Sequence, residues 1–253
     1  MTIAVEQLDV GLRRRTALGW LVTPAVLVAV LVALWLIVAG RQLDSIEERR
    51  VNLAFIGVAA MEHLTLTAVS TLLVLVIAIP LGVLLTRPSA RRITGPALAV
   101  FNVGQAIPSI GLLVILAIVW DVGFWPAVVA LVAYSALPVL RNTMVGIQQV
   151  DESVVESGRG MGLSRLQVLT RIELPLAVPV ILTGLRTALV INVGTATIAA
   201  LVNAGGFGGI IITGLVQNRQ LVTLVGSVLT AVLALAIDYL GRVAEEVLRP
   251  RGL

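Results

Sequence analysis

Long apolar runs dominate this sequence and decide what it can fold into. The chain of 253 residues has a mean hydropathy of +1.03, and only 13% of its residues are charged. A soluble domain of this size would need far more polar surface. An α-helix crosses the hydrocarbon core of a bilayer with about 20 apolar residues, and runs of that length recur here. The sequence therefore predicts an all-α, polytopic transmembrane helix bundle with about six spans.

The apolar runs place these spans at residues 16–39, 64–86, 96–120, 124–147, 177–202 and 221–240. Residues 40–63 start with charged side chains and end in an apolar part that is too short to span, which predicts an interfacial helix or folded loop. The first run lacks a small-residue cleavage pattern, so we expect a retained span. We divide the chain into an N-terminal region (1–61), a transmembrane core (62–241) and a C-terminal tail (242–253).

Basic residues gather in the connections on one side of the expected bundle. All 18 are arginines, and 14 of them face the cytoplasm if the N-terminus is cytoplasmic and the six spans alternate. This bias follows the positive-inside rule, so we expect both termini and the polar segment 150–175 in the cytoplasm. The arginines lie at the ends of apolar runs and not on one polar face. The net charge of +4 therefore gives no indication of nucleic acid as a partner.

Several kinds of site are excluded by the residues that the chain lacks. Without Lys it cannot carry a standard Walker A phosphate loop. Without Cys it has no disulfide, thiol nucleophile or thiolate metal site, and a single His argues against a His-based metal site. We therefore expect no catalytic site, no bound cofactor and no metal in this chain.

The polar segment 150–175 interrupts the apolar runs in the second half of the chain. It carries three arginines and four acidic residues, so it cannot lie in hydrocarbon. Ser153 with Glu156, and Ser164 with Gln167, have the spacing of capping boxes, which predicts two short helices. Glycines at positions 158, 160 and 162 allow a sharp turn between them. We expect Pro175 to end the second helix, because the residue before a proline avoids the α region.

The second of these helices has an apolar face. Leu166, Leu169 and Ile172 follow one another at intervals of three residues, which predicts one apolar stripe. Helices of about ten residues are marginal alone and need a surface to pack against. That surface belongs either to a partner protein or to the chain's own bundle, and the pattern alone favours neither.

Part of this segment resembles the EAA loop of ABC importer permeases. The family pattern is Glu-Ala-Ala, three residues, Gly, nine residues and Ile-x-Leu-Pro, and every fixed spacing is present here, with Ser and Gly in place of the two alanines. The resemblance implies a coupling helix that inserts into a cleft on a separate ATPase subunit. The residues that it assigns to this contact are Glu156, Ser157, Gly158, Gly162, Leu163, Ile172 and Pro175.

The resemblance extends over roughly residues 62–240. The stretches 105–118, 137–151 and 185–215 resemble the permeases of osmoprotectant importers, the glycine betaine, carnitine and choline group. It implies a bacterial cytoplasmic (inner) membrane and a pathway formed with a second copy or a similar permease. It also implies an ABC ATPase, which would bind the ATP and Mg, and an extracytoplasmic substrate-binding protein. Permeases for amino acids or methionine share the loop and stay as an alternative.

Polar residues inside the third and fifth spans are candidates for the translocation pathway, because such residues are costly against lipid. The candidates are Gln105, Pro108, Ser109, Asn192, Thr195 and Thr197. The alternative is hydrogen bonding between spans. We slightly favour that alternative for Thr195 and Thr197, and the pathway for Gln105 and Asn192. Pro108 is expected to kink its span and free backbone carbonyls.

Other features have two interpretations each. The glycine-rich stretch 203–214 is either an external gate loop or a plain flexible connection. The four tryptophans could form a cation–π cage, but their places near span ends favour an interfacial belt. Asp238 could relay protons, although pairing with Arg242 is the simpler interpretation, and His63 is expected at the interface. A secondary transporter or channel without an ATPase is an alternative of another class. It predicts an ionisable residue in mid-span, which the sequence does not show.

Overall fold

The computed structural model describes residues 2–248, and every element within that range is helical. The elements are α1 (Thr2–Ala39), α2 (Ser45–Val51), α3 (Leu53–Leu85), η1 (Pro88–Ala90), α4 (Arg91–Ala106), α5 (Ser109–Val119), α6 (Phe124–Gln148), α7 (Glu152–Gly160), α8 (Arg165–Val168), η2 (Leu169–Glu173), α9 (Leu174–Ala199), η3 (Ala200–Val202), α10 (Phe207–Val216) and α11 (Gln220–Leu248). Five helices are long and apolar enough to cross a membrane, and a bent pair makes a sixth crossing if it counts as one span. The predicted all-α transmembrane bundle is confirmed.

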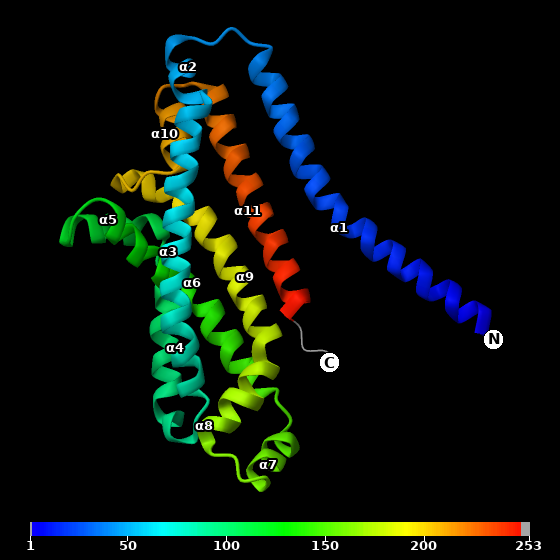
Figure 1. The fold of residues 1–253 in the computed structure, drawn as a ribbon. Helices are drawn as coiled ribbons and strands as arrows, with labels where there is room; N and C mark the ends of the chain where they lie inside the picture. The colour runs from blue at the N-terminus through cyan, green and yellow to red at the C-terminus, as the bar shows by residue number, and fades with distance from the viewer. Residues whose placement is uncertain (1, 249–253) are drawn as a thin grey trace.

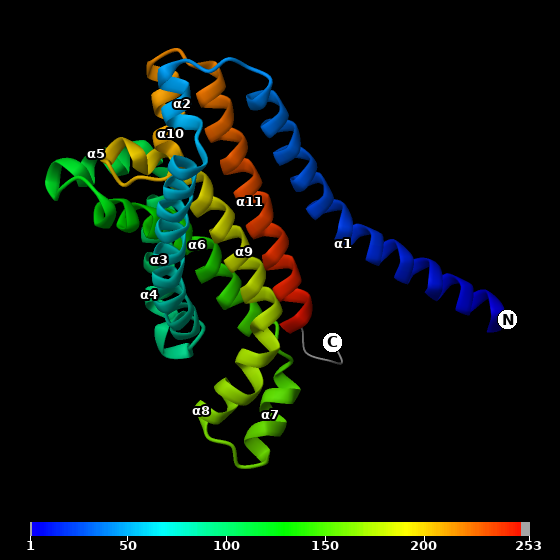
Figure 2. The same cartoon turned by 45° about the horizontal axis from the view of Figure 1, so that its top comes forward.

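Helices α3, α6 and α9 form the centre of the bundle, with α11 packed on α9 and α4 on α6 (Figure 1). Their buried side chains are apolar, as in the cluster of Leu66 from α3, Leu131 from α6 and Ala196 from α9. Helix α1 contacts α11 and otherwise extends away from the bundle (Figures 1 and 2). We call the end that carries α7 and α8 the α7 end, and the opposite end, with α2 and α10, the α2 end.

The second span is longer than the sequence predicts. Asn52 caps α3, because its side-chain oxygen accepts a hydrogen bond of 2.8 Å from the Phe55 N–H. The helix then runs unbroken for 33 residues to Leu85. Residues 53–61 are therefore the first turns of this span, and the expectation that they form a separate interfacial segment is wrong. Only α2 lies outside the span, and a capping box at Asp44 starts it.

The kink expected at Pro108 is present, and it breaks the third predicted span into two helices. Helices α4 and α5 meet at an angle of 96°. Pro108 lacks a backbone N–H and pushes Ile107 into an extended conformation with φ −71° and ψ 130°. As a result α5 extends sideways from the bundle (Figures 1 and 2). The chain turns between α5 and α6 at Asp121 and Gly123, and Gly123 has a φ of +126°.

Pro175 does not end the helix before it, contrary to the prediction. Leu174 is helical, with φ −64° and ψ −48°, and its N–H donates to the Leu169 carbonyl five residues back. This π-helical turn, η2, makes room for the proline ring at the start of α9. Residues 165–202 therefore form one continuous helical run, and α8 is directly connected to the fifth span.

The predicted three regions do not end between helices. Helix α3 crosses the boundary at residues 61 and 62, and α11 crosses the boundary at 241 and 242 before it ends at Leu248. Arg249 and Arg251 of the predicted tail lie outside the described residues. The division itself stays a prediction.

A close approach of α6 and α9 depends on Gly184. A Cβ atom at this position would lie 2.6 Å from the Asn142 Cβ and 2.9 Å from the Pro138 carbonyl oxygen. Both neighbours belong to α6, and one is backbone, so the helices would have to move apart. Gly194 lies in the same helix, but a Cβ there would meet nothing within 4 Å.

Gly184→Ala should therefore lower the free energy of unfolding by about 1–3 kcal/mol, the usual cost of overpacking. Thermal unfolding of the purified chain in detergent measures this. The matched control Gly194→Ala should be neutral or slightly stabilising, because Ala is the better helix former. Equal midpoints for the two variants would show that the α6–α9 contact does not need a glycine.

Candidate functional site

The segment that connects α6 to α9 forms a compact unit at the α7 end. Helix α7 begins at Asp151, whose carboxylate accepts a hydrogen bond of 2.8 Å from the Ser153 N–H. Hydrogen bonds from the Ser153 hydroxyl and N–H lower the pKa of Asp151 below its ordinary value. The predicted cap at Ser153 is thus wrong by two residues. The second predicted capping box is confirmed, because Ser164 and Gln167 bond each other's backbone N–H groups.

Gly162 makes the turn between α7 and α8, and Gly158 makes the contact between α7 and the π-helical turn η2. Gly162 has a φ of +84°, a conformation that residues with a side chain rarely adopt. Gly158 is buried in α7, and a Cβ there would lie 2.5 Å from the Ile172 Cδ1 atom and 3.6 Å from the Leu163 Cδ1 atom. Gly158 and Ile172, two fixed positions of the motif that are 14 residues apart, therefore lie in contact, with Leu163 beside them. This packing fixes α7 against the helical run that continues into α9.

Other residues of the motif point to solvent. Glu156 and Ser157 are exposed on α7, and Pro175 is exposed at the start of α9. No ion pair between the described residues involves Glu156. The Ser157 hydroxyl donates to the Ser153 carbonyl at 2.7 Å, so it is satisfied within α7. The segment thus combines a packed inner face with an exposed outer face that carries an acid.

The predicted apolar face of the second helix is only partly present. Leu166 is 69% exposed, whereas Val168 is 2% exposed and packs inward. The π-helical turn changes the number of residues per turn, so residues three and six positions apart no longer share one face. Glu173, at the end of this turn, is buried and pairs with Arg87 at the end of α3. The sequence pattern did not indicate this pair.

The predicted pathway residues lie at two places in the bundle. Gln105, Pro108 and Ser109 flank the bend between α4 and α5, and the Gln105 side-chain N–H donates to the Tyr134 carbonyl of α6 at 2.9 Å. Thr195 and Thr197 are partly exposed on α9, and the Thr197 hydroxyl donates to its own helix. Their role in transport stays a prediction.

Asn192 belongs to a buried polar row between α3 and α9. Its side-chain N–H donates to the Thr71 hydroxyl at 3.0 Å, and its side-chain oxygen has no partner among the described residues. His63, Thr67 and Ser70 continue the row along α3, and all are buried. Their spacing of three to four residues was the signal in the sequence that could have revealed it.

The glycine-rich stretch is not a flexible connection. Gly205 and Gly206 form a tight turn with φ of +81° and +83°, and α10 follows directly. The Glu62 carboxylate accepts a hydrogen bond of 2.8 Å from the Gly206 N–H, and the His63 ring stacks on Phe207. His63 is therefore buried inside the protein, and its expected place at the membrane interface stays a prediction. Whether α10 acts as a gate stays a prediction.

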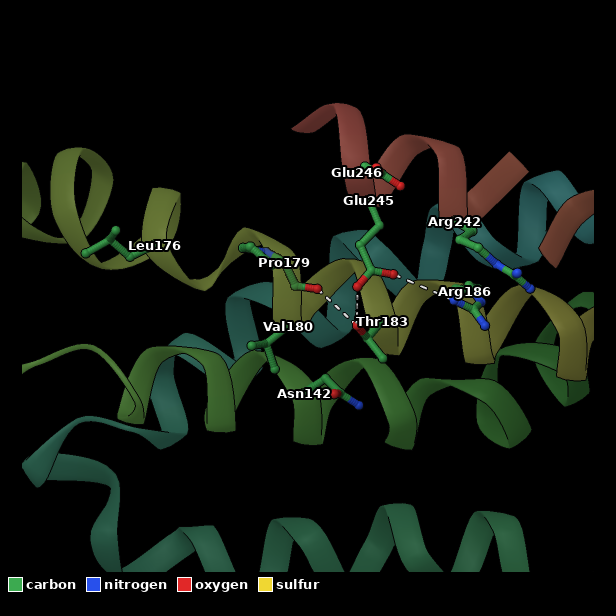
Figure 3. Close-up of a pocket in the computed structure, with 9 residues that line it drawn as sticks. All are labelled: Asn142, Leu176, Pro179, Val180, Thr183, Arg186, Arg242, Glu245 and Glu246. Atoms are coloured by element: carbon green, nitrogen blue, oxygen red, sulfur yellow. Dashed lines mark hydrogen bonds and ion pairs between the residues drawn. The ribbon is translucent and has the colours of Figure 1, made fainter. Parts of the chain in front are cut away.

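A charged cleft of about 760 Å³ opens between α6, α9 and α11 (Figure 3). Arg186 of α9 pairs with Asp238 of α11 at 2.5 Å, and Arg242 pairs with the same carboxylate at 3.1 Å. The expected Asp238–Arg242 pair is thus confirmed. Glu245 accepts a hydrogen bond from the Thr183 hydroxyl at 3.1 Å, on the wall of the cleft that Figure 3 shows. The Arg186–Asp238 and Thr183–Glu245 contacts fasten α11 to α9, whereas the Arg242–Asp238 pair lies within α11.

The tryptophans are spread over the surface. Trp35, Trp120 and Trp125 are 65%, 59% and 58% exposed, on three different helices or their ends. Trp20 contacts Tyr239 edge to face, with ring centroids 6.1 Å apart. This arrangement agrees with an interfacial belt.

Comparison with known proteins gives consistent matches. The model of the family described as binding-protein-dependent transport system inner membrane component matches residues 78–250. The choline transport system permease protein OpuBB of Bacillus subtilis is 39% identical over 76% of this chain and 88% of its own length. The osmoprotectant import permease protein OsmY of Salmonella typhimurium is 37% identical over 84% of this chain and 89% of its own length.

A solved structure has the same fold. An inward-facing structure of the MetNI methionine ABC transporter aligns with a TM-score of 0.68 and 25% identity, over 77% of this chain and 96% of the other. With its fold, its continuous α8–α9 run and these relatives, the chain belongs to the family of inner membrane components of binding-protein-dependent transport systems.

Proposed function

We propose that this chain is the permease subunit of an ATP-binding cassette importer for osmoprotectants, the class of quaternary ammonium solutes such as glycine betaine, choline and carnitine. It forms the translocation pathway with a second copy or a similar permease. A separate ATPase subunit binds at the α7 end, and an extracytoplasmic substrate-binding protein delivers the solute at the α2 end. The chain itself hydrolyses nothing, and ATP and Mg bind to the partner.

The observation that carries this proposal is the rigid α7–α8 unit with its exposed acid. The Leu163 and Ile172 side chains both lie against Gly158, and the contact with Ile172 joins α7 to the helical run that continues into α9. Glu156 therefore projects from a surface that does not depend on it for folding. Packing of this kind keeps the short helix α7 folded. The helix can therefore transmit a movement of the partner protein to the fifth span.

The charge distribution supports the orientation. Six described arginines lie at the α7 end, at positions 87, 91, 92, 159, 165 and 171, and four lie at the α2 end, at positions 41, 49, 50 and 219. The positive-inside rule therefore favours a cytoplasmic α7 end, and the family supports the cytoplasmic (inner) membrane. ATP binding would close the ATPase subunits and move the two α7–α8 units together. The bundles would then rock between inward-facing and outward-facing states. Docking of the loaded binding protein at the α2 end would bias the same equilibrium, which links delivery to hydrolysis.

The relatives favour an osmoprotectant over an amino acid. The curated relatives with 37–39% identity are named for choline and osmoprotectants, whereas the methionine transporter is 25% identical. A transporter that works without an ATPase does not fit the family.

Glu156→Arg should abolish capture of the ATPase and solute uptake while the chain still inserts and folds, because no described ion pair involves this exposed side chain. Co-purification from detergent measures capture, and thermal unfolding measures folding. Glu48→Arg, the same charge change on exposed α2 at the other end, is the control and should capture the ATPase normally. Capture by the Glu156 variant at the wild-type level would refute the role of this contact.

The solute class predicts a second outcome. In proteoliposomes with the ATPase and binding protein, glycine betaine, choline or carnitine should stimulate ATP hydrolysis, and methionine should not. Stimulation by methionine alone would favour the alternative importer. Solute uptake by the chain without any ATPase would overturn the importer proposal as a whole.

A further inference from the structure

An ion pair connects the coupling segment to a different part of the bundle. The two guanidinium NH2 groups of Arg87 approach the two carboxylate oxygens of Glu173 at 3.2 and 2.5 Å. Such a forked pair fixes both the distance and the orientation of the two groups. The residues are 86 positions apart in the chain, so the contact joins two elements that the backbone does not connect locally.

Both partners are held by their surroundings. The Glu173 side chain is 8% exposed and that of Arg87 is 31% exposed. Arg87 also donates from its Nε atom to the Val83 carbonyl of α3 at 3.3 Å, so the guanidinium is fixed to the end of that helix. Removal of one partner would leave the buried carboxylate without its counter-charge, which is strongly unfavourable.

Glu173 lies where the coupling segment meets the fifth span. It is the last residue of the π-helical turn η2 and follows Ile172, which packs on Gly158 of α7. Leu174, the next residue, packs with Ile147 and Ala177 at the inner contact of α6 and α9. Gly158 of α7 contacts the Ile172 side chain, and Ile172 is bonded directly to Glu173. A displacement of α7 would therefore move Glu173 as well.

Arg87 lies at a stiff corner between α3 and α4. The Thr94 hydroxyl of α4 lies 3.1 Å from the Leu85 carbonyl of α3 and 3.0 Å from the Ala90 carbonyl. Ala90 is 3% exposed and packs with Leu85. A force on Arg87 would therefore move α3 and α4 together, and α4 leads directly to the bend at Pro108.

We propose that Arg87 and Glu173 form a joint that carries movement of the α7–α8 unit to the α3–α4 corner, in parallel with the direct path into α9. The two are positioning residues, and this role rests on the proposed importer function. Without the joint, a displacement of α7 would rotate α9 alone, and the bend between α4 and α5 would not move with it. The ATPase would still bind and hydrolyse ATP, but less of that hydrolysis would move solute.

The first test uses the complete complex in proteoliposomes, with glycine betaine as the probe. Arg87→Glu and Glu173→Arg should each lower uptake per ATP hydrolysed by about five- to 150-fold, the usual span of coupling between two sites. ATPase capture should stay at the wild-type level. The double reversal should recover much of the loss. Arg87→Lys should lie in between, because it keeps the charge and loses the fork.

The control for this test is Arg242→Glu. Arg242 is exposed on α11, and the substitution breaks its ion pair with Asp238 of the same helix. It should leave uptake per ATP unchanged. Uptake and hydrolysis that fall together in the Arg87 and Glu173 variants would indicate a structural role and overturn the joint. So would a double reversal that is no better than the single ones. A wild-type chain that captures no ATPase would overturn the proposed function, and the joint with it.

The second test does not depend on the solute. Because the chain has no Cys, spin labels can be attached to cysteines that replace Ser89 at the corner and Thr170 in η2, both exposed. In the captured complex their separation should stay constant when ATP is added, because the joint moves as one body. In Arg87→Glu the separation should change with ATP. A constant separation in both, or a change in both, would refute the joint.

Discussion

The structure depends on one constraint: inside hydrocarbon, each backbone N–H and carbonyl must find a partner within the protein. Long helices satisfy this, and α3 does so for 33 residues without a break. Every interruption must therefore be compensated or placed where other groups can bond the freed backbone. Inside α6, Pro138 has no N–H to donate to the Tyr134 carbonyl four residues back, and the Gln105 side chain beside the α4–α5 bend bonds that carbonyl instead. At the turn before α10, the Glu62 carboxylate bonds the Gly206 N–H. Breaks in this bundle are thus built features, and each one is tied to a neighbouring helix.

The same constraint explains the coupling segment. A proline between a short helix outside the spans and the span that follows would ordinarily separate the two, and the connection would then act as a loose hinge. The π-helical turn before Pro175 keeps the backbone bonded, from Leu174 to Leu169, and makes α8, η2 and α9 one run. Gly158 lets α7 pack against this run through Ile172. Glycine in place of the family's second alanine brings the two helices close, because the Ile172 side chain occupies the space that a methyl group would need.

Much of this could be predicted from the sequence, because hydropathy and motif spacing are local signals. The spans, the turn at Gly123, the capping box at Ser164 and the family all follow from such signals. The predictions were wrong where contacts between distant parts of the chain, or caps and turns, determine the local structure. The second span starts at Leu53 and not at residue 64, because Asn52 caps the helix there, and hydropathy does not detect such a cap. The π-helical turn changed the apolar face of the second short helix and put Val168 inside in place of Leu166. The Arg87–Glu173 pair joins residues 86 positions apart, and no local pattern can indicate such a contact.

The distribution of charge shows how a bundle of this kind can move as rigid pieces. Apolar side chains in a bilayer gain little from one another relative to lipid, so packing alone gives helices few fixed contacts along their length. Ion pairs between helices supply them. Arg186 with Asp238 fastens α11 to α9, and Arg87 with Glu173 fastens the α3–α4 corner to the start of α9. Both pairs involve the α9 run, which also receives α7. Helix α9 is therefore the element to which the other moving parts are attached, and a push on the α7 end is distributed from it to both sides of the bundle.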